Sequence, residues 1–246
     1  MLKNKAELLN IEASLFLRKG QVGLLFKNMN EMLLCRVGRA PYAQTWAWQE
    51  ALRELRRKGQ IQDVLLLVEH PPTYTGGRAT LPEHLLSAGL EMVPINRGGS
   101  VTFHGPGQLV AYPIVDLRPR GRDVHQYLRD LEAVLMSTLA RYGLRGEART
   151  GLTGAWVDGR KVASIGIHVR HWITAHGLAL NVSTDMHYFA AIKPCGLGSE
   201  EMTTMNALLQ RVLCLAEVES AFLRAFADVF AIALTEVERG ELEALL

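Results

Sequence analysis

One of the three cysteines of the chain has surroundings unlike those of the other two. Cys195 lies between Pro194 and Gly196, outside any helical or alternating pattern of apolar residues. Such a turn would hold the thiol on a rigid loop and would let the following N–H groups face a substrate oxygen. A nucleophilic cysteine also needs a lowered pKa, which a helix N-terminus or a nearby cation supplies. Cys195 is therefore a candidate nucleophile.

The other two cysteines lie in apolar runs, Cys35 in Met32–Cys35 and Cys214 in Val212–Leu215. Both are predicted to be small buried hydrophobes. Three scattered cysteines are too few for a disulfide framework or a zinc site, and their odd number indicates a reducing compartment. We therefore expect no metal.

Two features could lower the pKa of Cys195: Lys161 and the start of a helix predicted near Met202. Lys161 follows Asp158-Gly159, the strongest short-range signal for a β-hairpin. A lysine just beyond a hairpin turn is commonly a solvated strand residue. Both interpretations of Lys161, solvated side chain or activating cation, stay open at this point.

A glycine-rich stretch runs from Arg97 to Gln108 and contains four glycines and a proline. This composition predicts a backbone with unusual dihedral angles that a ligand or another segment of the chain approaches closely. Polar side chains, among them Arg97, Thr102 and His104, surround that backbone. The alternative is a tight surface loop. A phosphate-binding P-loop is excluded, because the Gly-Lys-Ser/Thr ending is missing.

A third segment, His176–Val182, reads as a strand in which Gly177 and Ala179 leave one face unfilled. Small residues on such a face could line a slot for an alkyl chain. They could equally admit a neighbouring helix.

The remaining pattern predicts one α/β domain over residues 32–246, preceded by an N-terminal appendage of unknown role at residues 1–31. Pro41 is expected to open a helix that runs to about Arg57. The expected strands are 33–37, 63–69, 91–96, 109–115, 162–169 and 173–182, of which the last two are expected to pair with each other. The other expected helices are 124–142, 202–210 and 217–232.

The composition limits the partners that can be expected. A net charge of only +2 argues against a nucleic-acid binder. No apolar run approaches the roughly 20 residues that cross a bilayer, and the N-terminal mixture of lysine and glutamate does not suit a targeting signal. We expect a cytoplasmic protein without a membrane partner. Two arginine clusters are solvated surface or a docking patch for an acidic partner: Arg118, Arg120 and Arg122, and Arg141, Arg145 and Arg149.

Together the segments resemble the lipoyl-protein octanoyltransferase family, also called lipoate-protein ligase B. The similarity covers about residues 34–210, and its most specific part is His104–Gln108 combined with the downstream Pro194–Gly196. The other matching segments, in family order, are Glu69–Pro72, Tyr74–Thr75, Gly77–Arg78, Arg97–Thr102, Tyr112–Ile114, Lys161–Gly166 and His176–Val182.

The resemblance implies an α/β (α+β) cofactor-ligase fold in a single domain, with a mixed sheet flanked by helices, shared with lipoate and biotin protein ligases. It implies octanoyl transfer from octanoyl-acyl-carrier protein to a lysine of lipoyl domains, in the E2 subunits of 2-oxoacid dehydrogenases and the glycine-cleavage H protein. By position, Cys195 is the nucleophile that forms the acyl thioester and Lys161 activates it. No cofactor is implied. The implied substrate-binding residues are Arg97, Gly98, Gly99, Ser100, Val101, Thr102, Phe103, His104, Ser164, Ile165, Gly166, Gly177, Leu178 and Ala179.

Two other functions compete with this one. An ATP-dependent lipoate or biotin ligase activates a free acid as an adenylate and needs no cysteine, so the Pro-Cys-Gly turn counts against it. A non-catalytic protein that binds acyl carriers or lipoyl domains could dispense with Cys195 and Lys161, and both are present.

Overall fold

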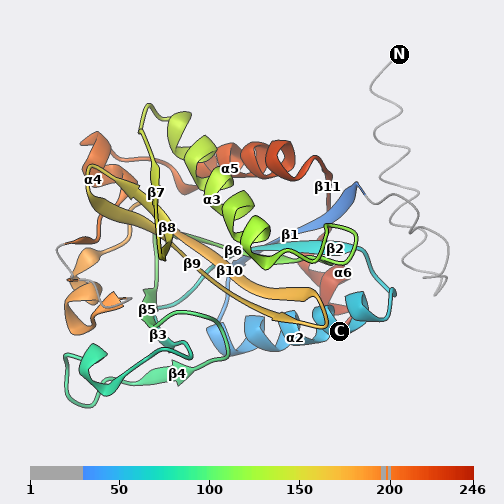
Figure 1. Cartoon of the computed structure of the whole chain (residues 1–246), viewed down its shortest axis with the longest axis horizontal. Coiled ribbons are helices and arrows are strands. Elements are labelled where there is room, and N and C mark those ends of the chain that lie inside the picture. The colour runs from blue at the N-terminus through green and yellow to red at the C-terminus, as the bar shows by residue number, and fades with distance from the viewer. Residues whose placement is uncertain (1–29, 195–197, 199–200) are drawn as a thin grey trace.

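The computed structural model describes residues 30–194, 198 and 201–246. The predicted appendage therefore lies almost entirely outside the described residues, as does Cys195. In the described part of the chain, a mixed sheet of eight strands forms the centre of the molecule (Figure 1). Its order is β11 (Ala233–Glu236), β1 (Glu31–Arg39), β2 (Asp63–Glu69), β6 (Gln108–Ile114), β10 (Ile173–Asn181), β9 (Arg160–Arg170), β8 (Leu152–Val157) and β7 (Glu147–Arg149).

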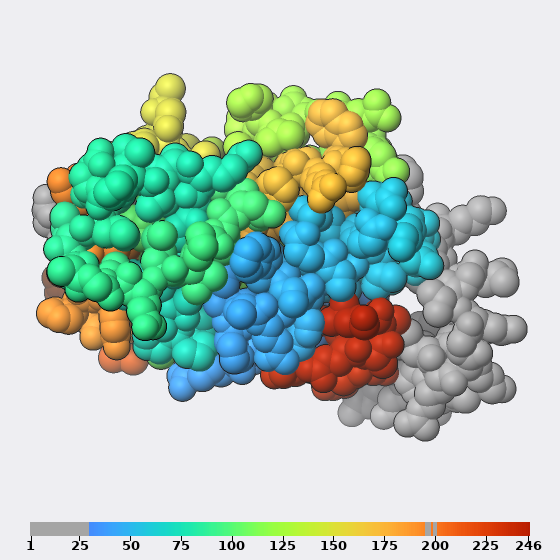
Figure 2. All heavy atoms as spheres, turned by 90° about the horizontal axis from the view of Figure 1, so that it is seen from below, coloured from blue at the N-terminus to red at the C-terminus, as the bar shows by residue number. Residues whose placement is uncertain are grey.

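Helices cover both faces of this sheet (Figure 1). The helices α3 (Val124–Ala140) and α5 (Leu215–Phe230) pack on one face, and α2 (Tyr42–Arg57) and α6 (Arg239–Glu243) pack on the other. Figure 2 shows α2 and α6 side by side on the second face, where the Arg239 guanidinium lies 5.1 Å from the centroid of the Trp48 ring. The predicted α/β fold, with a mixed sheet flanked by helices, is confirmed.

The strand β2 shows why the sheet needs both layers. Its residues alternate between two cores: Leu65 and Leu67 pack under α3 and α5, and Val64, Leu66 and Val68 pack against α2. Successive side chains of a strand point to opposite faces, so a run that is apolar throughout has to be covered on both sides.

A smaller sheet lies beside the large one and carries the glycine-rich stretch. Its order is β4 (Met92–Pro94), β3 (Thr73–Gly76) and β5 (Val101–His104). Two short 3-10 segments, η1 (Pro82–His84) and η2 (Met186–Ala191), accompany it. Val101, Phe103, Phe189, Ile192 and Met202 form its separate apolar core.

The strands β8, β9 and β10 form two consecutive antiparallel hairpins. Asp158 and Gly159 connect the first pair with positive φ angles of 48° and 79°, as the Asp-Gly signal predicts. His171 and Trp172 connect the second pair with φ angles of 53° and 65°, although neither is glycine. The pairing of β9 with β10 is the predicted one, and it fixes which of their residues lie opposite each other.

Two predictions near the C-terminus need correction. Cys214 is exposed rather than buried, because it occupies the N-cap position of α5 and not the interior of an apolar element. The helix predicted from Met202 begins only at Met205, as α4 (Met205–Leu209). Residues before it extend along β9, with the Thr203 N–H bonded to the Lys161 carbonyl at 2.9 Å, and the Thr204 hydroxyl caps the helix by accepting from the Ala207 N–H.

No helix in the part of the chain that the structure describes is long and apolar enough to cross a membrane.

Candidate functional site

A slot lies where α2, the small sheet and the β9–β10 hairpin meet. Its walls come from segments that are far apart in the sequence, and β9 and β10 supply one side of it. The residues that line it are Tyr42, Arg97, Gly99, Thr102, His104, Tyr112, Ser164, Ile165, Gly166, His176, Gly177, Leu178 and Ala179.

Most of the predicted binding residues lie on the walls of this slot, and four do not. Thr102 and His104 face the slot from β5, whereas Val101 and Phe103, which alternate with them, pack into the core of the small sheet. The other two outside the slot are Gly98 and Ser100, whose backbone and hydroxyl are bonded to Ile167 and His84 respectively. The substrate-binding role of all fourteen residues stays a prediction.

Arg97 holds the glycine-rich stretch together. Its guanidinium donates to the carbonyl oxygens of Thr75 at 2.8 Å and Ser100 at 2.6 Å, and it is 7% exposed. The buried positive charge is thus surrounded by carbonyl oxygens of the loop that it stabilises. Gly166 makes room for it, because a Cβ there would lie 3.0 Å from the Arg97 Cδ.

His176 forms one end of the slot and has a strained backbone, with φ at 58° inside a strand. Its N–H donates to the Gln49 side chain at 2.7 Å. Its ring nitrogens lie 3.3 Å from the Tyr42 hydroxyl and 2.7 Å from Asn96 Oδ1. Burial, with a smaller effect from Arg97, lowers the pKa of His176 to about 3, so the imidazole is neutral at physiological pH.

Two further histidines near the slot are neutral for the same reason. Burial lowers the pKa of His70 to about 4 and holds the pKa of His104 well below its usual value. His70 bonds the Tyr112 hydroxyl and the Ala40 carbonyl, both at 2.8 Å. Apart from Arg97, the polar side chains of the slot therefore carry no charge.

The structure excludes a solvated Lys161. The side chain is 1% exposed, and its ammonium lies 5.0 Å from the centroid of the Trp156 ring. Gly154 on the neighbouring strand β8 leaves space here, because a Cβ at Gly154 would lie 2.3 Å from the Ala163 carbonyl oxygen and 2.9 Å from the Lys161 Cε. Sequence analysis did not identify Gly154, and only its place on β8, opposite Ser164, reveals its role.

The segments on either side of the Cys195 loop are bonded to the rest of the site. Before it, the Lys193 N–H donates to the His84 carbonyl at 2.8 Å. After it, Met202 pairs with Lys161 in a parallel β-bridge. Cys195 itself lies outside the described residues, and its nucleophilic role stays a prediction.

Gly177 and Ala179 line the slot for different reasons. A Cβ at Gly177 would lie 2.1 Å from the Ala111 carbonyl oxygen, so glycine is needed there for the close approach of β6. Ala179 is 5% exposed and belongs to the same apolar cluster as Val110 and Tyr112. Of these two residues, Ala179 is therefore the one whose small side chain leaves space in the slot.

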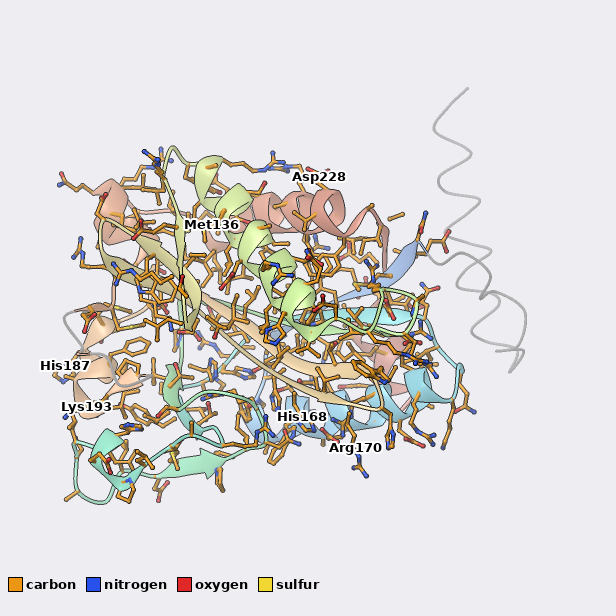
Figure 3. The ribbon with its side chains drawn as sticks, viewed as in Figure 1. Met136, His168, Arg170, His187, Lys193 and Asp228 are labelled. Carbon is orange, nitrogen blue, oxygen red and sulfur yellow. The ribbon has the colours of Figure 1, made fainter. Side chains whose placement is uncertain are left out.

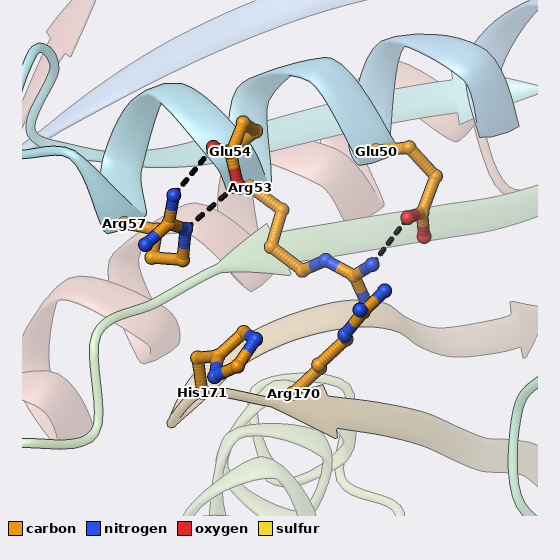
Figure 4. A pocket seen from close by; sticks show the side chains of 6 residues that line it. All are labelled: Glu50, Arg53, Glu54, Arg57, Arg170 and His171. Atoms are coloured by element: carbon orange, nitrogen blue, oxygen red, sulfur yellow. Dashed lines mark hydrogen bonds and ion pairs between the residues drawn. The ribbon is translucent and has the colours of Figure 1, made fainter.

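A second pocket, of about 390 Å³, lies at the far end of the same hairpin, between α2 and the β9–β10 turn (Figure 4). Here Glu50 pairs with Arg53, and Glu54 pairs with Arg57, while Arg170 and His171 face them. Figure 3 shows His168 and Arg170 along the lower edge of the view, away from Lys193 and His187 at its left edge. The charged pocket shares no lining residue with the slot and is separate from it.

The sequence of the chain is similar to those of known proteins. The chain matches the lipoyl protein ligase A/B catalytic domain over residues 41–227. It is 46% identical to an octanoyltransferase of Geobacter metallireducens over 187 residues, which cover 76% of this chain and 88% of that protein. The chain belongs to the octanoyltransferase family. An octanoyltransferase of Gloeobacter violaceus is 44% identical over 225 residues, 89% of this chain and 97% of the other.

Solved structures support the fold of this family member. Lipoate-protein ligase A bound with ATP superposes with a TM-score of 0.74 at 16% identity, over 87% of this chain and 92% of that one. A lipoate protein ligase from Thermoplasma acidophilum, solved as part of a lipoylation system with its E2 lipoyl domain, superposes with a TM-score of 0.68 at 18% identity, over 89% and 91% of the two chains. At these identities the likeness shows the shared fold alone, and it confirms the predicted relation to lipoate ligases.

Proposed function

We propose that this chain transfers an octanoyl group from octanoyl-acyl-carrier protein, through a thioester on Cys195, to a lysine of a lipoyl domain. The acceptors would be the lipoyl domains of 2-oxoacid dehydrogenase E2 subunits and the glycine-cleavage H protein. The observation that carries the proposal is the 44–46% identity to octanoyltransferases over most of both chains.

The geometry of the site supports an uncharged acyl substrate. Leu178, Ala179 and Ile165 give the slot apolar walls, and His104 and His176 are held neutral by burial. An alkyl chain gains free energy when apolar walls replace water, at roughly 25 cal/mol per Å² of apolar surface.

The environment of Lys161 supports its role beside the thiol. A buried lysine with its ammonium over an aromatic ring is unusual for a purely structural residue. Met202, which bridges Lys161, follows Cys195 by only seven residues in the sequence.

The proposed reaction has two steps. First the Cys195 thiolate attacks the carbonyl carbon of the carrier thioester, the carrier sulfur leaves and takes up a proton, and N–H groups near Gly196 stabilise the oxyanion. Then the amine of the acceptor lysine attacks the enzyme thioester, an amide forms and the Cys195 sulfur leaves. Lys161 stabilises the thiolate and relays a proton from the acceptor amine to the leaving sulfur.

The competing ATP-dependent ligase predicts a different donor, and one experiment separates the two. Purified protein is mixed with octanoyl-carrier protein and a lipoyl domain without ATP, and the mass of the lipoyl domain is measured. We expect one octanoyl group on the domain, and none with Cys195→Ser. Octanoylation only from free octanoate with ATP would overturn the proposal.

A further inference from the structure

The segment that follows the Cys195 loop is bonded on two sides. The Thr203 N–H donates to the Lys161 carbonyl at 2.9 Å, and the Thr203 carbonyl accepts from Asn181 Nδ2 at 3.2 Å. Both Thr203 and Asn181 are 2% exposed. The first bond ties the segment to the strand of Lys161, and the second ties it to the end of β10.

Asn181 is in turn oriented by a chain of buried side chains. Gln108 Nε2 donates to Asn181 Oδ1 at 2.9 Å and to the Phe103 carbonyl at 3.1 Å. Because both partners of this nitrogen are acceptors, the Gln108 amide has one orientation. Its Oε1 then accepts from His104 Nδ1 at 2.9 Å.

The protonation state of His104 agrees with this direction. Burial keeps the pKa of His104 well below its usual value, so the ring is neutral and has one N–H. The acceptor Gln108 Oε1 requires that N–H at Nδ1. From His104 to Thr203, donors and acceptors therefore follow one direction, and reversing any amide would place donor against donor.

Such a chain holds its last member firmly. Each buried group has a partner only while the next one keeps its orientation, so Asn181 cannot rotate without leaving Gln108 unsatisfied. Asn181 does not line the slot, and its side chain bonds only Gln108 and Thr203 among the described residues.

We propose that Asn181 is a positioning residue: by holding the Thr203 carbonyl, it keeps Met202 and Thr203, a few residues after the proposed nucleophile, beside Lys161. This inference rests on the proposed function. The effect of Asn181 should therefore appear in the reactivity of the thiol and in turnover, and not in the affinity for the acceptor.

The test compares two substitutions of the same kind. Asn181→Ser keeps a polar group near Gln108 but is too short to reach the Thr203 carbonyl. The control is Asn206→Ser, because Asn206 Oδ1 accepts from the Leu213 N–H at 3.0 Å and has no bond to Lys161 or its partners. Asn181→Ser loses the bond to Thr203 and weakens the one to Gln108, whereas Asn206→Ser loses one bond, so urea unfolding of both variants measures how much of any loss is stability alone.

With octanoyl-carrier protein and a lipoyl domain, we expect Asn181→Ser to lower kcat by about tenfold, the effect of one hydrogen bond, with KM for the acceptor unchanged. The pH midpoint of Cys195 alkylation should rise. Asn206→Ser should leave both at wild-type values. If Asn181→Ser does not fold, Gln108→Met tests the same chain one step earlier and should give the same pattern with a smaller loss.

The two proposals fail in different ways. A wild-type protein that forms no octanoyl thioester on Cys195 would refute the proposed function. A wild-type protein that forms it, with Asn181→Ser and Gln108→Met matching Asn206→Ser in kcat and alkylation midpoint, would overturn only the role of Asn181.

Discussion

At one end of the β9–β10 hairpin the polar side chains are buried and uncharged, and at the other end they are charged and paired. In the slot, Tyr42 and His176 bond each other and carry no charge at physiological pH. In the charged pocket near the β9–β10 turn, called the outer pocket below, Glu50–Arg53 and Glu54–Arg57 form ion pairs within α2 (Figure 4). Both pairs are partly exposed to water.

The difference follows from the cost of burying charge. A charge taken out of water needs strong partners. The slot therefore contains neutral groups and one arginine that is surrounded by carbonyl oxygens. In the outer pocket, by contrast, water also stabilises the charged groups. A slot with one enclosed arginine and otherwise neutral groups suits an uncharged acyl chain. Substitutions in the slot should therefore change chemistry and specificity, and substitutions in the outer pocket should change little.

The largest effect is expected at Lys161, the buried lysine proposed to activate the thiol. Lys161→Met keeps most of the volume and removes the charge, so transfer should fall by at least about 100-fold, and the pH midpoint of Cys195 alkylation should rise. Lys161→Arg should restore part of the alkylation rate and little turnover, since guanidinium does not readily give up a proton. Iodoacetamide labelling against pH measures the midpoint. Superimposable curves for wild type and Lys161→Met, with unimpaired transfer, would remove Lys161 from the mechanism.

The next effect distinguishes the two small residues of β10. Ala179→Leu fills the slot, so octanoyl transfer should fall more than butanoyl transfer. Gly177→Ala pushes a methyl group against the Ala111 carbonyl, so it should lower the free energy of unfolding and reduce transfer of both chains alike. Rates with the two carriers and urea unfolding check both statements. An Ala179→Leu variant with equal losses for both chains would show a packing defect instead.

Because the buried histidines are neutral in the folded protein, we expect the free energy of unfolding to fall in mild acid. His70 and His176 have folded pKa values of about 4 and about 3, below the unfolded value of 6.5. Between these values the unfolded state binds more protons, so the free energy of unfolding falls as pH falls, by about 1.4 kcal/mol per pH unit for each histidine. Urea unfolding at several pH values measures the slope. His70→Gln should make it shallower, and an unchanged slope would mean that His70 is charged in the folded protein.

The smallest effect is expected in the outer pocket. Arg57 and Glu54 are exposed and pair within one turn of α2. Arg57→Gln should leave octanoyl transfer within about twofold of wild type, because exposed ion pairs contribute little. A loss comparable to that of Ala179→Leu would contradict the separation of the two pockets.

Local patterns predicted the hairpins, and the family resemblance implied ten of the residues that line the slot. Asp158-Gly159 fixed the first turn, and the pairing of β9 with β10 then placed Ser164 opposite Ala179 and Gly166 opposite Gly177. Motif matching selects continuous runs of residues, but successive side chains of a strand point to opposite faces. The motif therefore could not separate Thr102, which lines the slot, from Val101, which packs in the core of the small sheet.

Contacts between distant elements could not be predicted in this way. The helical period shows that Tyr42 is on a buried face but not that it meets His176. The burial of Lys161 depends on Trp156 and Gly154 of the neighbouring strand. These contacts come from tertiary packing, which local sequence patterns do not encode.

The central claim is the proposal that an acyl thioester forms on Cys195. The direct measurement is the intact mass of the protein after mixing with octanoyl-carrier protein, followed by peptide mapping. The account predicts one octanoyl adduct, labile to hydroxylamine and located on Cys195. An adduct on Cys35 or Cys214, or no adduct on freshly purified protein, would contradict it.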